Sequence, residues 1–373
     1  KHRFDFSVFS LYEEKAEEQS KKYKNSNFYY MKSPEVINCF DKAIYWIAKN
    51  LFKKTNLISY RCILRRLYVM SKFPKILLKN DFDRLVLVTN STLFFVLKNK
   101  KVAKKYEGKT IYYLHNEVRS LFKCEKEAAS IRNLIGISEF VNDSFRKQVP
   151  TLRKEQCYVL KNGVDTVRFT ARDERKIKEY KNKYGIKDND FVVIFAGRLV
   201  GEKGALETIK AIKECKDEHI KLLIVGAGFY SSDIIDDYTL ELQEEAEGIK
   251  DRIVFTGYID YKDMSSVYQL GNVAVLPSMW EEPAGMTMVE AVVSGLPLIT
   301  TNSGGIPEYI PAELAYMLDR NKDLVKNISW CILQIKNSVA NNATLNTVKR
   351  NKFIEEIGLE KYFEGFEYIL KKG

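Results

Sequence analysis

The stretch "FVVIFAGRLVGEKGALETIKAIKEC" (residues 191–215) decides the fold, because a strand, a short loop and a helix follow one another directly in it. β-branched and aromatic residues dominate its first part, and "ALETIKAIKEC" at its end reads as a helix. A buried strand that leads straight into a helix is the repeating unit of a parallel α/β sheet. The stretch therefore predicts an α/β domain built on such a sheet.

The same alternation of strand and helix patterns runs through the rest of the chain. A first series of strands is predicted at residues 4–10, 27–31, 84–90, 110–115, 134–138 and 157–163. A second series is predicted at residues 191–197, 221–228, 252–257, 273–278 and 296–301. One hydrophobic core usually stops growing at about 250 to 300 residues. The 373 residues therefore predict two doubly wound, Rossmann-like domains.

Between the two series, the segment "NGVDTVRFTARDERK" interrupts the pattern, and a turn is predicted at Asn162 and Gly163. The last segment of the chain is aromatic-rich and reads as a helix that packs onto another part of the molecule. We predict an N-terminal domain over residues 1–165, a second domain over residues 166–350, and a C-terminal helix over residues 351–373 that packs back on the N-terminal domain.

Cysteine and histidine usage excludes several classes of protein. The six cysteines form no CxxC pair, and the three histidines make a histidine-based metal site a poor hypothesis. No apolar run approaches the ~20 residues that a transmembrane helix needs. These patterns are typical of a reduced, cytoplasmic protein.

Charge is divided unevenly along the chain. Residues 1–165 hold 33 Lys and Arg against 17 Asp and Glu, whereas the remainder has a net charge of −5. Within residues 42–105, 16 basic residues stand against two acidic ones. A basic N-terminal half attracts an anionic partner, which could be nucleic acid, a phospholipid surface or a substrate that carries a diphosphate. Nothing in the sequence resembles a nucleic-acid-binding module.

Residues 42–79 are predicted to form helices with one basic face. The apolar side is predicted to hold Ile44, Ile47, Ala48 and Leu51, and the basic side Lys42, Lys49 and Lys53. Two interpretations remain open. The basic face is either an ordinary solvated surface or a patch that rests on anionic lipid headgroups.

The loop "RLVGEKG" places two cations, Arg198 and Lys203, at the start of a predicted helix. The helix macrodipole already presents about half a positive charge there, so added cations are unfavourable unless an anion lies between them. Together with the backbone amides around Gly201 and Gly204, they would hold a diphosphate. The alternative is an ordinary exposed loop.

"VGAGFYSS" resembles a dinucleotide fingerprint only in part. Ser231 occupies the position of the third glycine, and the strand is the second of its domain instead of the first. Gly226 and Gly228 are more simply explained by a loop that approaches a ligand closely.

"EEPAGMTMVEAVVSGLP" (residues 281–297) carries two carboxylates eight positions apart. Pro283 and Gly285 disfavour helix, so Glu282 is predicted in a loop and Glu290 one turn inside a helix that begins near Met286. Eight residues at helical rise span about 12 Å, which is too far for the paired carboxylates of a glycoside hydrolase. The spacing favours the two ends of one elongated ligand, such as a sugar and a ribose.

A family resemblance rests on these same residues. "GRLVGEKG", "NGVDTVRF", "VSGLPLITTNSGGIPEYI" and the two glutamates together resemble the retaining GT-B glycosyltransferases, specifically glycosyltransferase family 4. The resemblance is strong over residues 159–309 and weak in the N-terminal half, where "LHNE" and "IGISEFV" carry it. Ala284 stands where the family commonly has Phe. The resemblance implies two Rossmann-like domains that face each other across a cleft.

The resemblance also implies roles for individual residues. Glu282 would accept hydrogen bonds from hydroxyls of the donor sugar, and Glu290 would bind the ribose. Arg198 and Lys203 would neutralise the departing diphosphate in place of a metal ion, and His115 would face the anomeric carbon. Further donor-binding positions are Gly197, Gly226, Gly257, Tyr258, Ile259, Pro283, Ala284, Gly285, Met286 and Thr287.

The implied function is a retaining transfer of a hexose or N-acetylhexosamine from a nucleoside-diphosphate sugar. UDP is favoured as the nucleotide, and a lipid-linked glycan of cell-surface polysaccharide synthesis as the acceptor. Neither a metal nor a cofactor is expected, although "DFD" (81–83) and "DND" (188–190) leave a metal-binding alternative open. A non-catalytic partner of another glycosyltransferase is the second alternative. The chain begins at Lys1, at what looks like the family's second strand, so we expect the first βα unit to be absent from it.

Overall fold

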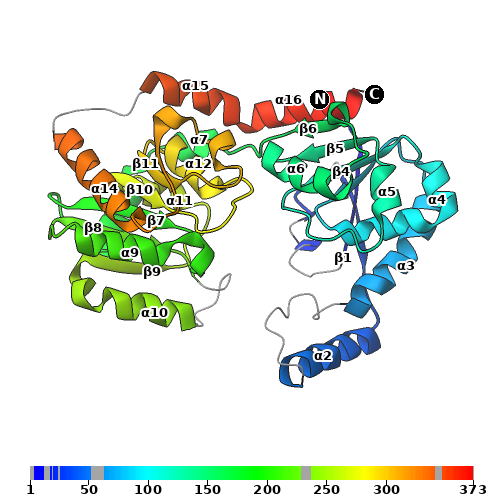
Figure 1. Cartoon of the computed structure of the whole chain (residues 1–373), viewed down its shortest axis with the longest axis horizontal. Coiled ribbons are helices and arrows are strands. Elements are labelled where there is room, and N and C mark those ends of the chain that lie inside the picture. The colour runs from blue at the N-terminus through cyan, green and yellow to red at the C-terminus, as the bar shows by residue number, and fades with distance from the viewer. Residues whose placement is uncertain are drawn as a thin grey trace. The chain divides into compact units, whose positions relative to one another are not determined.

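The computed structural model describes residues 4–11, 17–18, 20–23, 26–51, 63–227, 237–340 and 347–372. Its elements alternate between strands and helices, and parallel sheets form its core (Figure 1). The chain divides into two compact units. Unit 1 consists of Lys1–Tyr112 and Ser120–Arg132, and unit 2 of Tyr113–Arg119 and Asn133–Gly373.

Unit 1 contains the first strands and the basic helices. Its elements are β1 (Phe6–Leu11), β2 (Ser26–Met31), α2 (Glu35–Asn50), α3 (Ile63–Lys79), β3 (Leu85–Val88), the 3-10 helix η2 (Ser91–Lys98), α4 (Lys100–Lys105), most of β4 (Thr110–Leu114) and α5 (Glu125–Ala129). β1 and β2 pair in parallel as a sheet of their own. The ring of Phe9 in β1 stacks on Tyr29 of β2 at 4.7 Å and lies 5.5 Å from the ring of Phe73 in α3. Aromatic packing therefore joins this small sheet to α3.

Helices α2 and α3 confirm the predicted helical character of this segment, but the predicted apolar side of α2 is wrong. Ile47 and Leu51 are exposed by 41% and 71%, whereas Ala48 and Asp41 are buried. The reason is a polar contact between the helices. The Asp41 carboxylate accepts hydrogen bonds from the backbone amides of Leu64 (2.8 Å) and Arg65 (3.0 Å) at the start of α3. This cap turns the Asp41 side of α2 inward. Lys53 lies outside the described residues.

Unit 2 contains one six-stranded parallel sheet in the order β12-β11-β10-β7-β8-β9. Its strands are β7 (Phe191–Ala196), β8 (Ile220–Val225), β9 (Ile253–Gly257), β10 (Val273–Leu276), β11 (Leu298–Thr301) and β12 (Ala315–Leu318). Val193, Ile194 and Leu223 are fully buried between its helical layers. The strand order reverses direction at β7 and β10, as in a doubly wound fold.

Strands β5 (Asn133–Gly136) and β6 (Cys157–Val159) pair in parallel in the same unit and are the last two strands in the sheet order β3-β4-β5-β6. Unit 2 includes the helices α6 (Glu139–Gln148), α7 (Thr166–Thr170), α8 (Glu174–Lys183), α9 (Ala205–Glu214), α10 (Asp237–Ala246), α11 (Met264–Tyr268), α12 (Met286–Val293), α13 (Ile306–Tyr309), α14 (Leu324–Ala340), α15 (Thr347–Ile357) and α16 (Leu359–Lys371). Short 3-10 turns are η3 (Lys154–Gln156), η4 (Gly201–Lys203), η5 (Glu247–Arg252) and η6 (Ala312–Leu314).

The C-terminal helices pack against other parts of unit 2. The hydroxyls of Tyr362 in α16 and Tyr113 lie 3.1 Å apart, and a Cβ added to Gly365 would lie 2.9 Å from the Leu160 side chain. In Figure 1, α16 lies beside β6. The predicted domain limits remain predictions. The two compact units are divided at other positions.

All the predicted strands are present, most of them shorter than predicted. The strand predicted at 221–228 ends at Val225, and Gly228 and Ser231 lie outside the described residues. β12 was not predicted. The expected α/β class with Rossmann-like parallel sheets is confirmed.

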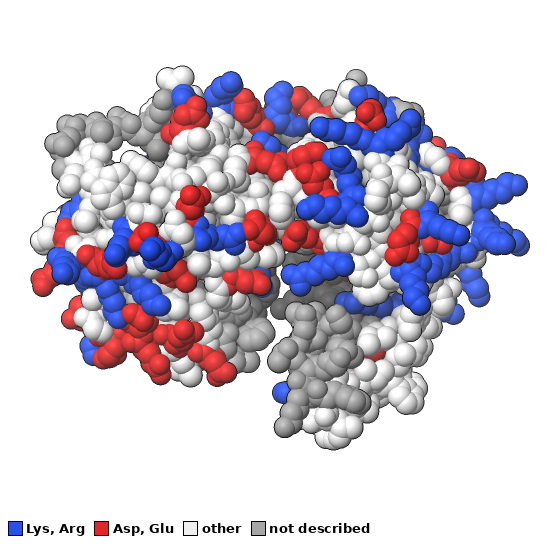
Figure 2. Space-filling view, viewed as in Figure 1, with Lys and Arg blue, Asp and Glu red and all other residues white. Residues whose placement is uncertain are grey.

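Charge gathers on separate surfaces of the two units. Figure 2 shows basic side chains over α4, whose sequence is KKVAKK, and acidic ones over α10, whose sequence is DYTLELQEEA. The visible face of α2 is mostly uncharged in the same view. Among the described residues, no helix is both long enough and apolar enough to cross a bilayer.

Candidate functional site

Three predicted glycines meet at the carboxyl ends of neighbouring strands. The Gly197 amide donates to the Val225 carbonyl (3.0 Å), and the Gly226 amide donates to the Gly257 carbonyl (3.1 Å). A Cβ on Gly226 would lie only 1.8 Å from the carbonyl oxygen of Gly197, and Gly226 has a φ of +146°. Only glycine fits this close approach. The ends of β7, β8 and β9 therefore form one surface of backbone without side chains at Gly197, Gly226 and Gly257, which we call the glycine ledge.

The loop after β7 is anchored against the end of β10. Gly204 has a φ of +76°, and a Cβ at this position would lie 2.0 Å from the carbonyl oxygen of Pro277. The Met279 amide donates to the Glu202 carbonyl at 2.8 Å. These contacts place the N-terminus of α9 beside the loop that carries Glu282. Arg198 is exposed, and no ion pair is recorded for it within the described ranges.

Glu282 receives three donors on one oxygen. Its Oε2 accepts from Lys203 Nζ at 2.5 Å, from Trp280 Nε1 at 2.9 Å and from Ser278 Oγ at 3.4 Å. The residue is only 9% exposed. Lys203 and Glu282, separated by 79 positions, therefore form an ion pair close to Gly197. Their predicted roles at the donor stay predictions.

The adjacent Glu281 is a structural anchor instead. Its Oε2 accepts from the Gly304 amide at 2.6 Å, and its other oxygen pairs with Arg320. The Gly305 amide donates to the Glu282 carbonyl at 2.7 Å, and Gly304 approaches so closely that a Cβ would lie 2.4 Å from this carbonyl oxygen. The backbone of Gly304 and Gly305 thus holds the loop that carries Glu281 and Glu282 in place.

Helix α12 begins at Met286, as predicted, after Gly285 in the left-handed conformation with a φ of +70°. Pro283 and Ala284 are buried ahead of it, and Met286 and Thr287 are half-buried in its first turn. The Ser138 hydroxyl donates to the Pro283 carbonyl at 2.9 Å. Glu290 follows in the second turn, on the same helix as the predicted sugar contacts.

Glu290 is buried among tyrosines. It is 7% exposed, and the hydroxyls of Tyr261 and Tyr268 donate to its carboxylate, the latter at 3.4 Å. Burial raises the pKa of Glu290 to about 7, and the two hydroxyls oppose the rise. The Tyr268 hydroxyl also donates to the Thr287 carbonyl at 3.2 Å. Glu290 is therefore half protonated close to neutral pH.

The segment after β9 supplies exposed aromatic rings. Tyr258 is exposed, Ile259 is half-buried, and the Arg168 guanidinium lies 5.2 Å from the centre of the Tyr261 ring. Arg168 comes from "NGVDTVRF", where the Asp165 side chain caps α7. This motif therefore supports the wall of the site that holds Glu290.

His115 makes its contacts away from the residues around Glu282 and Glu290. It follows β4, its ring centre lies 4.4 Å from that of Tyr113, and burial lowers its pKa. No hydrogen bond or ion pair within the described ranges joins it to the side chains of the predicted donor site. Its predicted role at the anomeric carbon stays a prediction.

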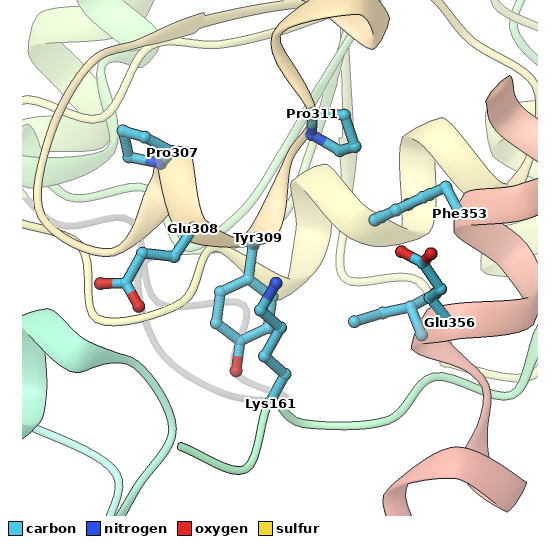
Figure 3. A pocket seen from close by; sticks show the side chains of 8 residues that line it. Lys161, Pro307, Glu308, Tyr309, Pro311, Phe353 and Glu356 are labelled. Atoms are coloured by element: carbon cyan, nitrogen blue, oxygen red, sulfur yellow. The ribbon is translucent and has the colours of Figure 1, made fainter. Parts of the chain in front are cut away.

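A separate cavity of about 140 Å³ lies among Lys161, Pro307, Glu308, Tyr309, Pro311, Phe353, Glu356 and Ile357 (Figure 3). The Glu308 carboxylate at its edge accepts from the first amides of α6, at Glu139 (2.6 Å) and Phe140 (2.8 Å). Lys161 Nζ lies 5.8 Å from the centre of the Tyr309 ring. None of the predicted donor-binding residues lines this cavity.

The described residues contain no cluster of three or more His, Cys, Asp or Glu side chains suited to a metal ion. In the two acidic triplets, Asp188 pairs with Lys181 at 2.5 Å, and Asp81 lies 3.7 Å from Lys105. Both are mostly exposed.

Comparison with known proteins identifies the domain that carries this site. Residues 176–343 match the model of the family described as glycosyl transferases group 1. YtcC of Bacillus subtilis (strain 168) is 31% identical over 218 residues, which cover 56% of this chain and 53% of YtcC. Spore coat protein SA of the same organism is 28% identical over 243 residues, which cover 62% and 63% of the two chains. Each match thus spans less than two thirds of the relative.

Solved structures agree on the fold. HepE of Anabaena in complex with UDP and glucose aligns with a TM-score of 0.73 at 16% identity, over 98% of this chain and 92% of HepE. A glycosyltransferase from Rickettsia africae ESF-5 aligns with a TM-score of 0.70 at 18% identity, over 98% and 90% of the two chains. The chain has the GT-B fold, and its residues 176–343 are similar to the glycosyl transferases of group 1.

Sequence reasoning missed four side chains of the site, namely Ser278, Trp280, Tyr261 and Tyr268. Ser278 and Trp280 lie only four and two positions before Glu282, and this closeness in sequence was a usable signal. Tyr261, which precedes α11, and Tyr268, at the end of α11, reach Glu290 from 29 and 22 positions away in sequence, which no local pattern reveals.

Proposed function

We propose that the chain is a retaining, metal-independent glycosyltransferase that moves a hexose or N-acetylhexosamine from a nucleoside-diphosphate sugar to a glycan acceptor. The observation that carries the proposal is the contrast between the two glutamates of one loop and helix. Glu282 lies beside the cation Lys203 at the glycine ledge, and Glu290 lies among tyrosines on α12. A charged subsite and an enclosed subsite eight residues apart suit a sugar diphosphate at one end and a ribose at the other.

UDP is the favoured nucleotide. The solved structure of HepE, which shares the fold, contains UDP and glucose. Tyr258 and Ile259, after β9, are positioned next to Gly257 where a base could stack, and Glu290 would accept hydrogen bonds from the two ribose hydroxyls. These roles are part of the proposal.

The proposed reaction needs few groups. The acceptor hydroxyl attacks the anomeric carbon on the face from which the diphosphate departs, a bond to the acceptor oxygen forms as the bond to the phosphate oxygen breaks, and the acceptor proton passes to that phosphate oxygen. Lys203, Arg198 and the N-terminus of α9 would stabilise the charge on the leaving diphosphate. Glu282 would hold the sugar hydroxyls, and His115 would face the anomeric carbon.

A thermal-shift screen against UDP, GDP and their common sugar conjugates tests the donor, because a ligand that binds only the folded state raises its apparent stability. Product analysis by NMR tests the mechanism, and we expect the anomeric configuration of the donor to be retained. An inverted product would overturn the mechanism. Tight donor binding without transfer or donor hydrolysis would favour the non-catalytic alternative.

We also infer that unit 1 contacts an anionic membrane surface, at the cytoplasmic face, where a lipid-linked acceptor would be available. Val36, Phe40, Trp46 and Ile47 of α2 and Leu51 at its C-cap are exposed. Lys42 and Lys49 are exposed on other sides of the same helix. An apolar face and cations on one helix are the pattern of an interfacial helix. Each nearby cation adds about 1 kcal/mol at an anionic surface.

Vesicle co-sedimentation tests this inference. We expect binding to vesicles that contain phosphatidylserine, weaker binding to neutral vesicles and loss in high salt. Phe40→Asp in α2 should reduce binding, whereas Val167→Asp, a substitution of another exposed apolar residue in α7, should not. Equal binding by the two variants, or binding insensitive to lipid charge and salt, would contradict the inference.

A further inference from the structure

Trp280 contacts both members of the Lys203–Glu282 ion pair. Its indole Nε1 donates to Glu282 Oε2 at 2.9 Å, and the Lys203 ammonium lies 5.4 Å from the centre of its ring. Lys203 itself lies 2.5 Å from the same Oε2. One half-buried side chain therefore holds the carboxylate by a hydrogen bond and the ammonium by a cation–π contact.

The three donors on Glu282 converge on a single oxygen. A carboxylate offers about four lone-pair sites on its two oxygens, and Lys203, Trp280 and Ser278 all donate to Oε2. In the described part of the chain, no donor is recorded for Oε1. The asymmetry leaves Oε1 as the oxygen that can accept a hydrogen bond from a ligand.

Hydrogen bonds other than that of the indole hold the loop on both sides of Trp280. The Ser278 amide donates to the Leu276 carbonyl at 3.1 Å and the Met279 amide to the Glu202 carbonyl at 2.8 Å. On the other side of Trp280, Glu281 is fixed to the Gly304 amide at 2.6 Å. Backbone anchors thus flank Trp280 on both sides. The indole N–H is free to serve the orientation of Glu282.

We propose that Trp280 is a positioning residue for donor-sugar recognition, which commits Glu282 Oε2 to the protein so that Oε1 reads a hydroxyl of the donor sugar. The inference rests on the proposed role of Glu282 at the sugar. In this role, Trp280 acts through Glu282 and makes no contact with the nucleotide. Removing the indole N–H therefore weakens recognition of the sugar and spares recognition of the nucleotide.

The test compares UDP with a UDP-sugar. The probe is whichever of UDP-glucose, UDP-galactose and UDP-N-acetylglucosamine binds the unaltered chain most tightly, and the readout is the ratio of the dissociation constants of UDP and this UDP-sugar. Trp280→Phe keeps a ring for Lys203 but removes the N–H. We expect the ratio to fall about tenfold, since a hydrogen bond to a charged group is at stake, while the UDP dissociation constant changes less than about twofold.

Two further variants separate positioning from structure. Trp330→Phe makes the same exchange on α14, where the side chain is 58% exposed, and should leave the ratio unchanged. In a Glu282→Gln background, Trp280→Phe should have no further effect on the ratio, because the two residues act as one unit.

The role of Trp280 would be overturned if Trp280→Phe leaves the ratio of dissociation constants unchanged, or if the effects of Trp280→Phe and Glu282→Gln on this ratio are additive. Either result would leave the proposed function intact. If the unaltered chain gains no affinity from any of the three sugars, the proposed UDP-sugar donor fails as well.

Discussion

The two glutamates of residues 281–297 lie on one short piece of chain, yet their surroundings are opposite in kind. Glu282 belongs to an ion pair, with a lysine, an indole and a hydroxyl on one oxygen. Glu290 is buried against two tyrosine hydroxyls, and burial raises its pKa to about 7. In the part of the chain that the structure describes, no cation is paired with Glu290.

The difference teaches that one motif can build two subsites that respond to different variables. Under the proposed function, occupancy of the Glu282 subsite would depend on charge, since Lys203 would be shared between Glu282 and the diphosphate. Occupancy of the Glu290 subsite would depend on pH, since burial raises the pKa of this carboxyl to about 7. Changes at the first subsite should affect sugar and diphosphate, and changes at the second the nucleoside.

The largest effect is expected from Lys203→Ala. The substitution removes the proposed stabiliser of the leaving diphosphate and leaves Glu282 without its cation. Loss of one such electrostatic group costs about 10²–10³ in rate, so we expect kcat for sugar transfer to fall by about that factor. Steady-state kinetics provide the measurement. Lys210→Ala on α9, a half-buried lysine away from Glu282, is the matched control, and equal losses in the two variants would contradict the assignment.

Glu290→Gln should change the pH dependence of stability. The pKa of Glu290 is about 7 in the folded chain against 4.5 as the ordinary value. The folded state therefore binds the proton more tightly than the unfolded state. The contribution is fully present below pH 4.5 and is lost as pH rises to 7. By linkage this amounts to up to about 3 kcal/mol.

Thermal unfolding between pH 4.5 and pH 7.5 measures this contribution. The unaltered chain should lose more stability across this window than Glu290→Gln, which has no carboxyl to titrate. Parallel pH profiles for the two chains would contradict the buried state of Glu290.

A smaller effect is expected on donor binding. If the charged form of Glu290 accepts the ribose hydroxyls, affinity for a UDP-sugar should fall about tenfold as pH drops from 8 to 6, following the fraction of charged carboxyl around pH 7. A UDP-sugar is the suitable probe, because its diphosphate has no terminal phosphate group that titrates near pH 6. Calorimetric titrations should show the slope in the unaltered chain and a flat profile in Glu290→Gln. A slope that persists in the variant would assign it to another group.

The smallest effect is expected from Tyr268→Phe. The Tyr268 hydroxyl donates to Glu290 and lowers its pKa, so its removal should move the midpoint of the pH profile upward by less than about one unit. The hydroxyl distance of 3.4 Å indicates a weak bond, which limits the shift. A downward shift of the midpoint would contradict the described contact.

Sequence reasoning located much of this arrangement because the relevant signals are local. Strand runs, the glycines at their ends and the change from loop to helix at Met286 all depend on neighbours in sequence. The family resemblance singled out both Lys203 and Glu282, which the structure joins in an ion pair. The resemblance also led to the GT-B fold.

The remainder depends on tertiary packing that local patterns do not encode. Helical periodicity placed Ile47 and Leu51 of α2 on an inner side, but the cap that Asp41 makes on α3 selected another face. Sequence alone did not distinguish Glu281 from other exposed acidic residues. Its structural role depends on a hydrogen bond from the Gly304 amide, which is 23 positions away. Tyr261 and Tyr268 likewise reach Glu290 by contacts between residues distant in sequence.

The central claim is that the two glutamates hold opposite ends of one nucleotide sugar. Dissociation constants of UDP and of the preferred UDP-sugar, measured for the unaltered chain, Glu282→Gln and Glu290→Gln at pH 8, test it most directly. The account predicts that Glu282→Gln abolishes the gain in affinity from the sugar without weakening UDP binding, because Lys203 stays available to the diphosphate, and that Glu290→Gln weakens the binding of both ligands by the same factor. Loss of the sugar gain in Glu290→Gln with UDP binding intact, or weaker UDP binding in Glu282→Gln alone, would contradict it.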